Sequence, residues 1–360
     1  MKKLRLGILF GGRSAEHEVS LQSAKNVIEA LDKNKYELVL IGIDRSGKWY
    51  LNEASHFLLH EDDPAHISLE HGKTELAMIP GASSSQIVPL DGEKVIDQLD
   101  VIFPVLHGPY GEDGTVQGLL RMADIPFVGA DVLGSAVSMD KDVMKRLLKE
   151  AKIPQAKFQS YVESEQKRID IETLRSQVGM PCFVKPANLG SSVGISKVHN
   201  EKELMPALEK AFEFDHKIIV EEYIQGREIE CSVLGNENPI ASLPGEVMPS
   251  HEFYSYEAKY LDQKGASFQI PAALTDQLIK DIQDLAIKTF RILNCEGMAR
   301  VDFFLKADGQ VLVNELNSIP GFTKISMYPK LWEVSGISYS ELLDRLVELA
   351  IDRHKRRKGV

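Results

Sequence analysis

Two acidic side chains in the last third of the sequence are spaced so that a hairpin would bring them together. Segments 299–305 and 310–317 have the pattern of strands, and the Asp-Gly dipeptide at 308–309 is a preferred two-residue hairpin turn. If this dipeptide is the centre of the turn, Asp302 lies directly opposite Glu315. Like charges opposed across a sheet are destabilising unless something neutralises them. The pair therefore predicts a bound cation.

The same register places Arg300 opposite Asn317 and puts all four polar side chains on one face, because strand side chains alternate. Carboxylate and amide oxygens suit Mg²⁺, with phosphate oxygens completing its octahedron. The alternative is a solvated strand face with incidental acids, and a β-bulge would move one carboxylate to the wrong face. The opposite face is apolar and expected in the core; it carries Val301, Phe303, Leu312 and Leu316.

A second candidate is the glycine- and serine-rich loop between two apolar segments, 182–186 and 194–198. It lacks the glycine spacing of a P-loop or a dinucleotide fingerprint, and no helix follows it. Glycines let backbone N–H groups approach phosphate oxygens, and Ser191 and Ser192 add hydroxyl donors. Lys185 at the end of the first segment would reach a phosphate as a point charge. The loop is predicted to be a lid over a reactive phosphate, the alternative being a mobile surface hairpin.

Two further glycine-rich turns follow apolar segments in the first third of the chain. In GGRSAEHEVS (11–20), Glu16 stands where a helix is expected to begin, and its alternative role is to complement the helix dipole. In HGPYGEDG (107–114), the alternative to a functional loop is a plain connection. Both turns are candidates for ligand contacts.

The first part of the chain alternates strands and helices. Residues 45–95 are polar and irregular and resemble an insertion, and 126–129 closes the unit. The pattern indicates a doubly wound α/β domain whose ligand edge is formed by the loops after its strands. The predicted elements are strands over 4–10, 38–43 and 101–106 and helices over 19–31 and 115–123.

The pattern changes near residue 137, where a small α+β domain is expected to begin. Its predicted elements are helices over 138–151 and 201–214 and strands over 157–161, 182–186 and 194–198. The strand that starts at 217 leads into a third region, a mostly antiparallel sheet with a long loop. That region is expected to hold helices over 275–293 and 339–353.

The composition excludes several classes of protein. A chain of 360 residues predicts two or three domains, and its formal net charge of -11 argues against binding a nucleic acid backbone. The basic run 353–358 is expected on the last turn of a terminal helix. Cys182, Cys231 and Cys295 are far apart, which predicts core residues in a reducing compartment. No signal peptide and no membrane span of ~20 apolar residues is evident, so a cytoplasmic location is expected.

Taken together, these segments resemble the D-alanine–D-alanine ligase family of ATP-grasp enzymes over nearly the whole chain. The segments that carry the resemblance are GGRSAEHEVS (11–20), LHGPYGEDGTVQG (106–118), SMDK (138–141), FVKPANLGSSVGISKV (183–198), YEAKY (256–260), ARVDFF (299–304) and NELNSIPGFT (314–323). The resemblance implies an N-terminal substrate-binding α/β domain (1–136) followed by a two-domain ATP-grasp fold. Its central domain (137–222) carries the lid, and its C-terminal domain (223–360) carries the metal site and an omega-type loop.

The resemblance also implies a reaction. ATP and two D-alanine molecules would give ADP, phosphate and D-alanyl-D-alanine through a D-alanyl phosphate, for peptidoglycan synthesis. ATP would be a substrate, two Mg²⁺ or Mn²⁺ would be bound, a K⁺ requirement stays open, and a homodimer is implied. Charge builds on phosphoryl and carbonyl oxygens, so the site must supply fixed cations and N–H donors. D-alanine–D-lactate or D-alanine–D-serine ligase of the same family is the alternative.

The resemblance assigns roles to residues of this chain. The implied catalytic residues are Glu16, Ser191, Lys259, Tyr260, Arg300 and Gly321, with Arg300 and the Gly321 N–H as the oxyanion hole. Those that would bind substrate are His107 and Ser326. Those that would bind ATP are Lys141, Lys185, Ser192, Glu221, Glu222, Tyr223, Ile224 and Glu228. Asp302, Glu315 and Asn317 would hold the metal ions. Many members carry Lys where this chain has Glu222, which leaves the role of that side chain open.

Two other classes of protein share part of this sequence pattern. A dehydrogenase would share the doubly wound N-terminal pattern, but the chain lacks GxGxxG, and hydride transfer has no use for an acidic metal hairpin. A non-catalytic nucleotide-binding module would not need four polar side chains on one face of a hairpin. A change in NAD absorbance would identify the first class, and phosphate release with D-alanine would exclude the second.

Overall fold

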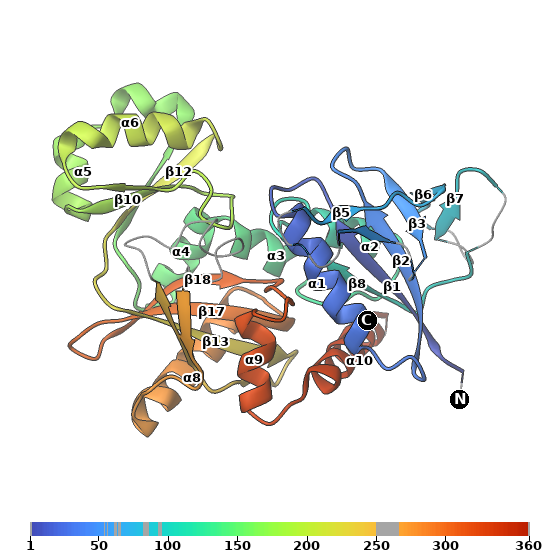
Figure 1. Ribbon diagram of the computed structural model, residues 1–360. Helices are drawn as coiled ribbons and strands as arrows, with labels where there is room; N and C mark the ends of the chain where they lie inside the picture. The colour runs from blue at the N-terminus through green and yellow to red at the C-terminus, as the bar shows by residue number, and fades with distance from the viewer. Residues whose placement is uncertain are drawn as a thin grey trace.

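Three sheets follow one another along the chain and form the frame of the molecule (Figure 1). The computed structural model describes residues 2–53, 55, 57–60, 63, 66–81, 86–92, 96–249 and 266–358. In Figure 1 the N-terminal sheet, drawn in blue, stands apart from the central sheet, and the C-terminal sheet lies below the central sheet and to the left of the N-terminal one.

The N-terminal sheet has the strand order β7-β6-β3-β2-β1-β8. β1 pairs in parallel with β2 and β8, as the apolar runs predict, whereas β3, β6 and β7 add to the sheet in antiparallel fashion. The polar segment 45–95 is therefore not only an insertion, because three of its strands extend the sheet. The elements are β1 (Leu4–Gly11), α1 (His17–Ala30), β2 (Tyr36–Ile43), β3 (Trp49–Asn52), β6 (Thr74–Met78), β7 (Ile87–Pro89), β8 (Val101–Val105) and α2 (Thr115–Met122), beside a small sheet of β4 (Leu58–Leu59) and β5 (Ser68–Leu69).

The central sheet is antiparallel, with the order β11-β10-β12-β9, and two helices cover one of its faces (Figure 1). The predicted strands over 157–161, 182–186 and 194–198 correspond to β9, β10 and β11, with ends shifted by one or two residues. The covering helix α5 and the short η1 were not predicted. The elements are α3 (Val132–Met139), α4 (Lys141–Glu150), β9 (Phe158–Val162), η1 (Glu163–Arg168), α5 (Ile171–Val178), β10 (Cys182–Pro186), β11 (Ser196–Val198), α6 (Glu201–Phe212) and β12 (Lys217–Glu222).

The single helix predicted over 138–151 is wrong, because the chain breaks at Asp140 into α3 and α4. Asp140 has extended backbone angles, φ −80° and ψ 100°, and its carboxylate accepts hydrogen bonds from the N–H groups of Asp142 and Val143. Aspartate is a preferred N-cap because it satisfies the free N–H groups of the first turn. The break places Lys141 in the first turn of α4, next to the site.

The C-terminal sheet is antiparallel, with the order β16-β15-β13-β17-β18 and β14 paired to β13. The helices predicted over 275–293 and 339–353 are confirmed as α8 and α10, the latter longer than expected. The elements are β13 (Arg227–Gly235), β14 (Ile240–Ala241), β15 (Gly245–Pro249), β16 (Ala266–Gln269), α8 (Asp276–Ile292), β17 (Gly297–Leu305), β18 (Val311–Asn317), α9 (Met327–Val334) and α10 (Tyr339–Lys358).

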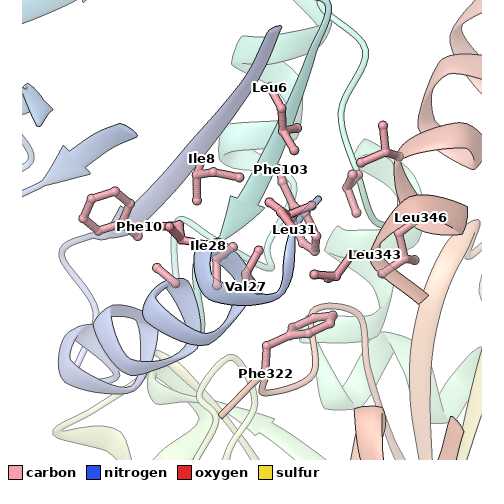
Figure 2. Close-up of a cluster of buried hydrophobic side chains, with 14 of the residues drawn as sticks. Leu6, Ile8, Phe10, Val27, Ile28, Leu31, Phe103, Phe322, Leu343 and Leu346 are labelled. Carbon is pink, nitrogen blue, oxygen red and sulfur yellow. The ribbon is translucent and has the colours of Figure 1, made fainter. Parts of the chain in front are cut away.

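One hydrophobic core joins the N-terminal sheet to the C-terminal part of the chain. Figure 2 shows Phe322 beside Leu343 and Leu346 of α10, facing the side chains of α1, β1 and β8. The rings of Phe322 and Phe103 meet edge to face with centroids 5.5 Å apart, a favourable aromatic geometry. This contact fixes the chain after β18 against the strand ends of the first sheet.

The predicted core placement of the cysteines and the predicted helical position of the basic run are confirmed. All three cysteines are free and buried. The basic run lies on the last turns of α10, where the buried Arg353 donates hydrogen bonds to the carbonyls of Phe127 and Gly129. Within the described ranges, no helix is both long enough and apolar enough to cross a membrane.

Candidate active site

The hairpin of β17 and β18 brings the predicted polar residues together. Arg300 pairs with Asn317, and Asp302 pairs with Glu315, as the sequence predicts. The predicted turn, however, is wrong. The N–H of Lys306 donates to the carbonyl of Gln310 at 3.0 Å, so three residues, not two, form the turn.

A bulge compensates for the extra turn residue. The register shifts between Asp302 and Phe303, and Phe303 pairs with Val313, which leaves Asn314 as the additional residue. Leu312 then pairs with Phe304 and shares the face of the polar residues, so the predicted face is wrong, although Leu312 is buried as predicted, at 6% exposure. Val313 packs in the core instead. The two carboxylates lie opposite each other because the register shift caused by the longer turn is reversed by the bulge.

One cavity of about 170 Å³ collects most of the predicted site. Ten of the predicted residues line it: Glu16, His107, Ser191, Glu228, Arg300, Asp302, Glu315, Asn317, Gly321 and Ser326. An adjoining cavity brings Lys141 beside Glu315 and Asn317. Neither cavity is lined by Lys185, Ser192 or residues 221–224. The implied roles of Lys259 and Tyr260 fall on positions outside the described residues.

The polar face of the hairpin has strong internal electrostatics. Arg300 is held by Asp302 through two hydrogen bonds of 2.7 and 2.8 Å, and Glu230 lies 2.9 Å from its Nε. Burial opposes the charge of Arg300, yet Asp302 and Glu230 hold its pKa well above the ordinary value. Asn317 donates to Asp302 at 3.0 Å, and Glu315 lies 3.9 Å from the ammonium of Lys141.

The donor set of this face fits a hard divalent cation. Carboxylates are in excess, since Glu228, Glu230, Asp302 and Glu315 line the cavity that holds Arg300. In the part of the chain that the structure describes, no three His, Cys, Asp or Glu side chains form a complete metal cage. Two carboxylates and an amide are instead the incomplete set that Mg²⁺ uses when phosphate supplies further ligands.

The glycine- and serine-rich loop lies directly over Glu16. The Ser191 hydroxyl hydrogen-bonds with the Glu16 carboxylate, a contact that the family resemblance implies. Ser191 and Ser192 have left-handed backbone angles, with φ of 51° and 62°, which non-glycine residues rarely adopt. A Cβ atom on Gly190 would lie 3.0 Å from the Glu16 carboxylate, so this approach favours glycine. The carbonyl of Leu189 accepts a hydrogen bond from Lys141 at 2.6 Å.

Lys185 is held by a buried charge cluster that the sequence did not reveal. Its ammonium lies 2.6 Å from Glu221, and Lys145 of α4 contacts the same carboxylate. Burial alone would raise the pKa of Glu221, but the two ammonium groups lower it to about 2. The side chain of Glu221 thus positions a lysine. Lys145 stands four residues after Lys141 on one helix, so both side chains lie on the same face. This spacing was the signal in the sequence that Lys145 is near the site.

Residues 221–224, which the resemblance implies bind ATP, span the end of β12 and do not line the main cavity. Glu222 accepts a hydrogen bond from the N–H of Lys157 at 3.1 Å, which ties the end of β12 to β9. The ammonium of Lys197 lies 4.3 Å from the ring centre of Tyr223. Glu222, Tyr223 and Ile224 line a separate cavity with the turn of the β17–β18 hairpin.

Glu112 is a partly buried acid of the site that sequence reasoning missed. Its two oxygens accept hydrogen bonds from the N–H groups of Gly108 at 2.8 Å and Ile319 at 2.9 Å. Burial, and then the charge of Glu16, raise the pKa of Glu112 to about 8 despite these bonds. The signal in the sequence was an acid within the GEDG stretch of the 107–114 turn.

The segment that follows β18 contacts His107 near its start and ends at Ser326. His107 is 4% exposed, and its Nδ1 lies 3.1 Å from the carbonyl of Ile319. Because a carbonyl only accepts, Nδ1 carries the proton. Ser326 is the N-cap of α9. Its hydroxyl accepts from the N–H of Thr323 at 3.0 Å, close to the helix N-terminus that favours anions.

His107 is expected to make the protein less stable in acid. Burial lowers its pKa to about 4, whereas the unfolded chain binds this proton near pH 6.5. Between these values the unfolded state binds more protons, so the unfolding free energy should fall as pH drops from 6.5 to 4, by about 1.4 kcal/mol per pH unit from this group. Urea unfolding of wild type and His107→Gln across this range measures the difference in slope. An imidazole of folded wild type that titrates above pH 6 in NMR would contradict the expectation.

Comparisons with known proteins agree with this geometry. Residues 5–130 match the family model described as D-ala D-ala ligase N-terminus, and residues 147–348 match D-ala D-ala ligase C-terminus. The chain is 57% identical to a D-alanine–D-alanine ligase of Oceanobacillus iheyensis over 99% of this chain and 97% of that protein. It is 52% identical to D-alanine–D-alanine ligase A of Escherichia coli K12, over 98% and 97% of the two chains.

Solved structures are similar over the same extent. The D-alanine–D-alanine ligase from Coxiella burnetii has a TM-score of 0.86 at 39% identity and covers 100% of this chain and 97% of its own. The VanG D-Ala:D-Ser ligase from Enterococcus faecalis has a TM-score of 0.85 at 36% identity, with coverage of 97% and 100%. The sequence, the ATP-grasp fold and the cavity lead to one conclusion: the chain belongs to the D-alanine–D-alanine ligase family.

Proposed function

We propose that this chain joins two D-alanine molecules at the expense of ATP and forms D-alanyl-D-alanine, ADP and phosphate for peptidoglycan synthesis. The observation that carries the proposal is the single cavity in which Glu16, Arg300 and the Asp302–Glu315 pair meet. The relatives named D-alanine–D-alanine ligase, at 57% and 52% identity over nearly the full length, support the substrate.

In the first step, the carboxylate of one D-alanine attacks the γ-phosphorus of ATP, and a D-alanyl phosphate and ADP result. Lys141 and Lys185 would hold phosphate oxygens, and the Ser191–Ser192 loop would exclude water from the acyl phosphate. Mg²⁺ held by Asp302, Glu315 and Asn317 would supply positive charge to the phosphoryl oxygens. The Glu16 carboxylate would pair with the ammonium of this first D-alanine.

In the second step, the amine of another D-alanine attacks the acyl carbon, and phosphate leaves from a tetrahedral intermediate. Arg300 and the N–H of Gly321 would stabilise its negative oxygen, since preorganised donors act where charge develops. Ser326 at the start of α9 would bind the carboxylate of the second D-alanine. The buried Asp302 partner aims the guanidinium of Arg300 at the cavity.

Finer properties belong to the proposal as well. ATP binding would use residues 221–224 with Ser192 and Glu228, and either Mg²⁺ or Mn²⁺ would serve. A homodimer and the domain limits 1–136, 137–222 and 223–360 follow from the family resemblance. A cytoplasmic location is the expectation from the sequence, and a K⁺ requirement stays open.

The direct test is phosphate release with ATP and Mg²⁺ in the presence of D-alanine, L-alanine, D-serine or D-lactate. We expect release with D-alanine alone and with mixtures that contain it, and D-alanyl-D-alanine as the main product. No release with D-alanine would refute the proposed function. The D-alanine–D-serine alternative is favoured by the likeness to a D-Ala:D-Ser ligase, and a mixed dipeptide as the main product with both amino acids present would establish it.

Tyr260 is expected to control the choice of the second substrate. In the family, a tyrosine at this position accompanies D-alanine, and a phenylalanine accompanies tolerance of D-lactate. Loss of one buried hydrogen bond costs about 0.5–1.5 kcal/mol, enough to relax discrimination without unfolding the protein. Tyr260→Phe should retain ligase activity and gain D-alanyl-D-lactate, most visibly at pH 6, where the competing amine is protonated. Product analysis at pH 6 and pH 8 decides, and equal depsipeptide from wild type and variant would oppose this role.

A further inference from the structure

The residues on both sides of Gly321 are held by Glu112 and Ser23, which have no assigned role, and by His107. On one side, the N–H of Ile319 donates to Glu112 at 2.9 Å, and its carbonyl accepts from His107 at 3.1 Å. On the other side, the N–H of Phe322 donates to the hydroxyl of Ser23 at 3.2 Å. Gly321 therefore lies in a short segment whose backbone is hydrogen-bonded at both ends.

These bonds form one consistent chain of donors and acceptors. Nδ1 of His107 donates to Ile319, so Nε2 is an acceptor in the neutral ring. The hydroxyl of Ser23 lies 3.0 Å from this Nε2 and donates to it. The Ser23 oxygen is then free to accept the N–H of Phe322. The lowered pKa of His107 agrees with a ring that stays neutral.

The side chains that hold the segment are themselves fixed. Ser23 is completely buried on α1, and Glu112 is anchored to its own loop through the N–H of Gly108 at 2.8 Å. Groups with such anchors lose little entropy when they order another segment, and they position a neighbour accurately. The two attachment points come from sequence positions about 200 to 300 residues away from Gly321.

Gly321 also fits closely against the start of α9. A Cβ atom at this position would lie 2.7 Å from the hydroxyl of Ser326. The backbone of Gly321 thus passes within contact distance of the group proposed to bind the second substrate. A small rotation of this peptide would change the direction of its N–H and the space beside Ser326 together.

We propose that Ser23 and Glu112, with His107 between them, form a clamp that sets the direction of the Gly321 N–H. Ser23 and Glu112 are positioning residues in this reading, which rests on the proposed function because Gly321 is taken as an oxyanion donor. The clamp acts on the tetrahedral step, because the preorganised donor matters most where negative charge develops. It leaves the ATP-binding residues untouched.

The test compares Ser23→Ala and Glu112→Gln with a matched control, Ser242→Ala. Ser242 is also completely buried, accepts the N–H of Ser232 at 3.0 Å and donates to the carbonyl of Leu243 at 2.9 Å. It lines neither cavity of the site. The glutamine variant keeps the shape of Glu112, but its NH₂ group must face one of the two N–H donors.

We expect each clamp variant to lower kcat by roughly 10- to 100-fold, below the 10²- to 10³-fold loss of a whole oxyanion donor. The KM for ATP should stay within about twofold, and the double variant should lose less than the product of the single losses, because both act on one segment. Binding of a phosphinate analogue of the tetrahedral intermediate should weaken with kcat. Amide hydrogen exchange at Ile319 and Phe322 should accelerate in the clamp variants and stay unchanged in Ser242→Ala.

The clamp is overturned if the two variants lose no more kcat than Ser242→Ala, or if exchange at Ile319 and Phe322 matches wild type. A rise in the KM for ATP with kcat unchanged also refutes it, because that change marks a loss of nucleotide binding. Absence of phosphate release by wild type refutes the proposed function instead. In that case the exchange measurement still decides whether Ser23 and Glu112 hold the segment.

Discussion

Glu315→Gln is expected to reduce phosphate release with ATP and D-alanine by on the order of 10³-fold or more, with the fold intact. Glu315 stands opposite Asp302 on the polar face and beside Lys141. Much of the rate enhancement in phosphoryl transfer comes from metal ions that neutralise charge on the phosphoryl oxygens. The carboxylates matter because they would bind these metal ions. A neutral amide of the same size keeps the packing and removes that charge.

Asp302→Asn provides a second measurement on the same face. Asp302 also holds Arg300 by two hydrogen bonds, so this variant should lose activity and in addition weaken the guanidinium of the oxyanion hole. Glu315 should matter more, because the family resemblance implies that it would hold both metal ions. Phosphate release measured across a range of Mg²⁺ concentrations separates weakened metal binding, which high Mg²⁺ rescues in part, from lost chemistry.

An exposed acid gives the control for these variants. Glu341 forms a surface ion pair with Arg345 on α10, remote from the cavity, and surface pairs contribute little. Glu341→Gln should therefore match wild type in both activity and unfolding. Activity of Glu315→Gln near that of Glu341→Gln at moderate Mg²⁺ would show that the metal site is assigned to the wrong residues.

Glu221→Gln is expected to lower the unfolding free energy by about 3–5 kcal/mol, the usual cost of removing one partner of a buried ion pair. Glu221 and Lys145 are each 2% exposed, and Glu221 compensates the charges of both Lys145 and Lys185. The variant deprives two buried ammonium groups of their shared carboxylate. The KM for ATP should rise as well, because Lys185 loses the group that positions it.

The comparison with Lys145→Met distinguishes charge from packing. This variant removes the second cation and leaves Glu221 paired one to one with Lys185, so it should destabilise the protein less than Glu221→Gln. Urea unfolding of the two variants at pH 7 makes the comparison. A larger loss in Lys145→Met would contradict the charge-balance interpretation, because methionine keeps an apolar stem of similar length and removes only the ammonium.

The same cluster makes the unfolding free energy depend on pH in acid. The pKa of Glu221 is lowered from 4.5 to about 2, so the folded state stays ionised where the unfolded chain is already protonated. Its stabilising contribution is complete above the unfolded pKa and is lost as pH falls toward 2. Glu221→Gln should therefore differ from wild type most at neutral pH, and the difference should narrow below pH 4.5.

The sequence by itself determined the polar face of the hairpin and many of the strands and helices, because these depend on local periodicity. Alternation with period two was enough to pair Asp302 with Glu315, and the apolar runs identified the parallel strands of the first sheet. The sequence also contained the motifs that gather in one cavity. The order of these motifs and the chemistry of their side chains can be recognised without a tertiary structure.

Local breaks in regular secondary structure were harder to predict from the sequence. The three-residue turn and the bulge at Asn314 cancel in the register, so a correct pairing followed from an incorrect turn, and Leu312 was assigned to the wrong face. The break at Asp140 competes with a continuous helical pattern, and only the capping bonds of its side chain decide the outcome.

The tertiary structure alone decided which groups share a charge or a hydrogen bond across the molecule. Glu221 meets Lys145 and Lys185 from different elements, and Glu112 meets Ile319 from a position 207 residues earlier in the chain. Such pairings depend on how sheets and helices pack, and a sequence pattern records only the neighbours along one element. Burial then sets the pKa of each group, because the removal of water strengthens the electrostatic interactions and hydrogen bonds that remain.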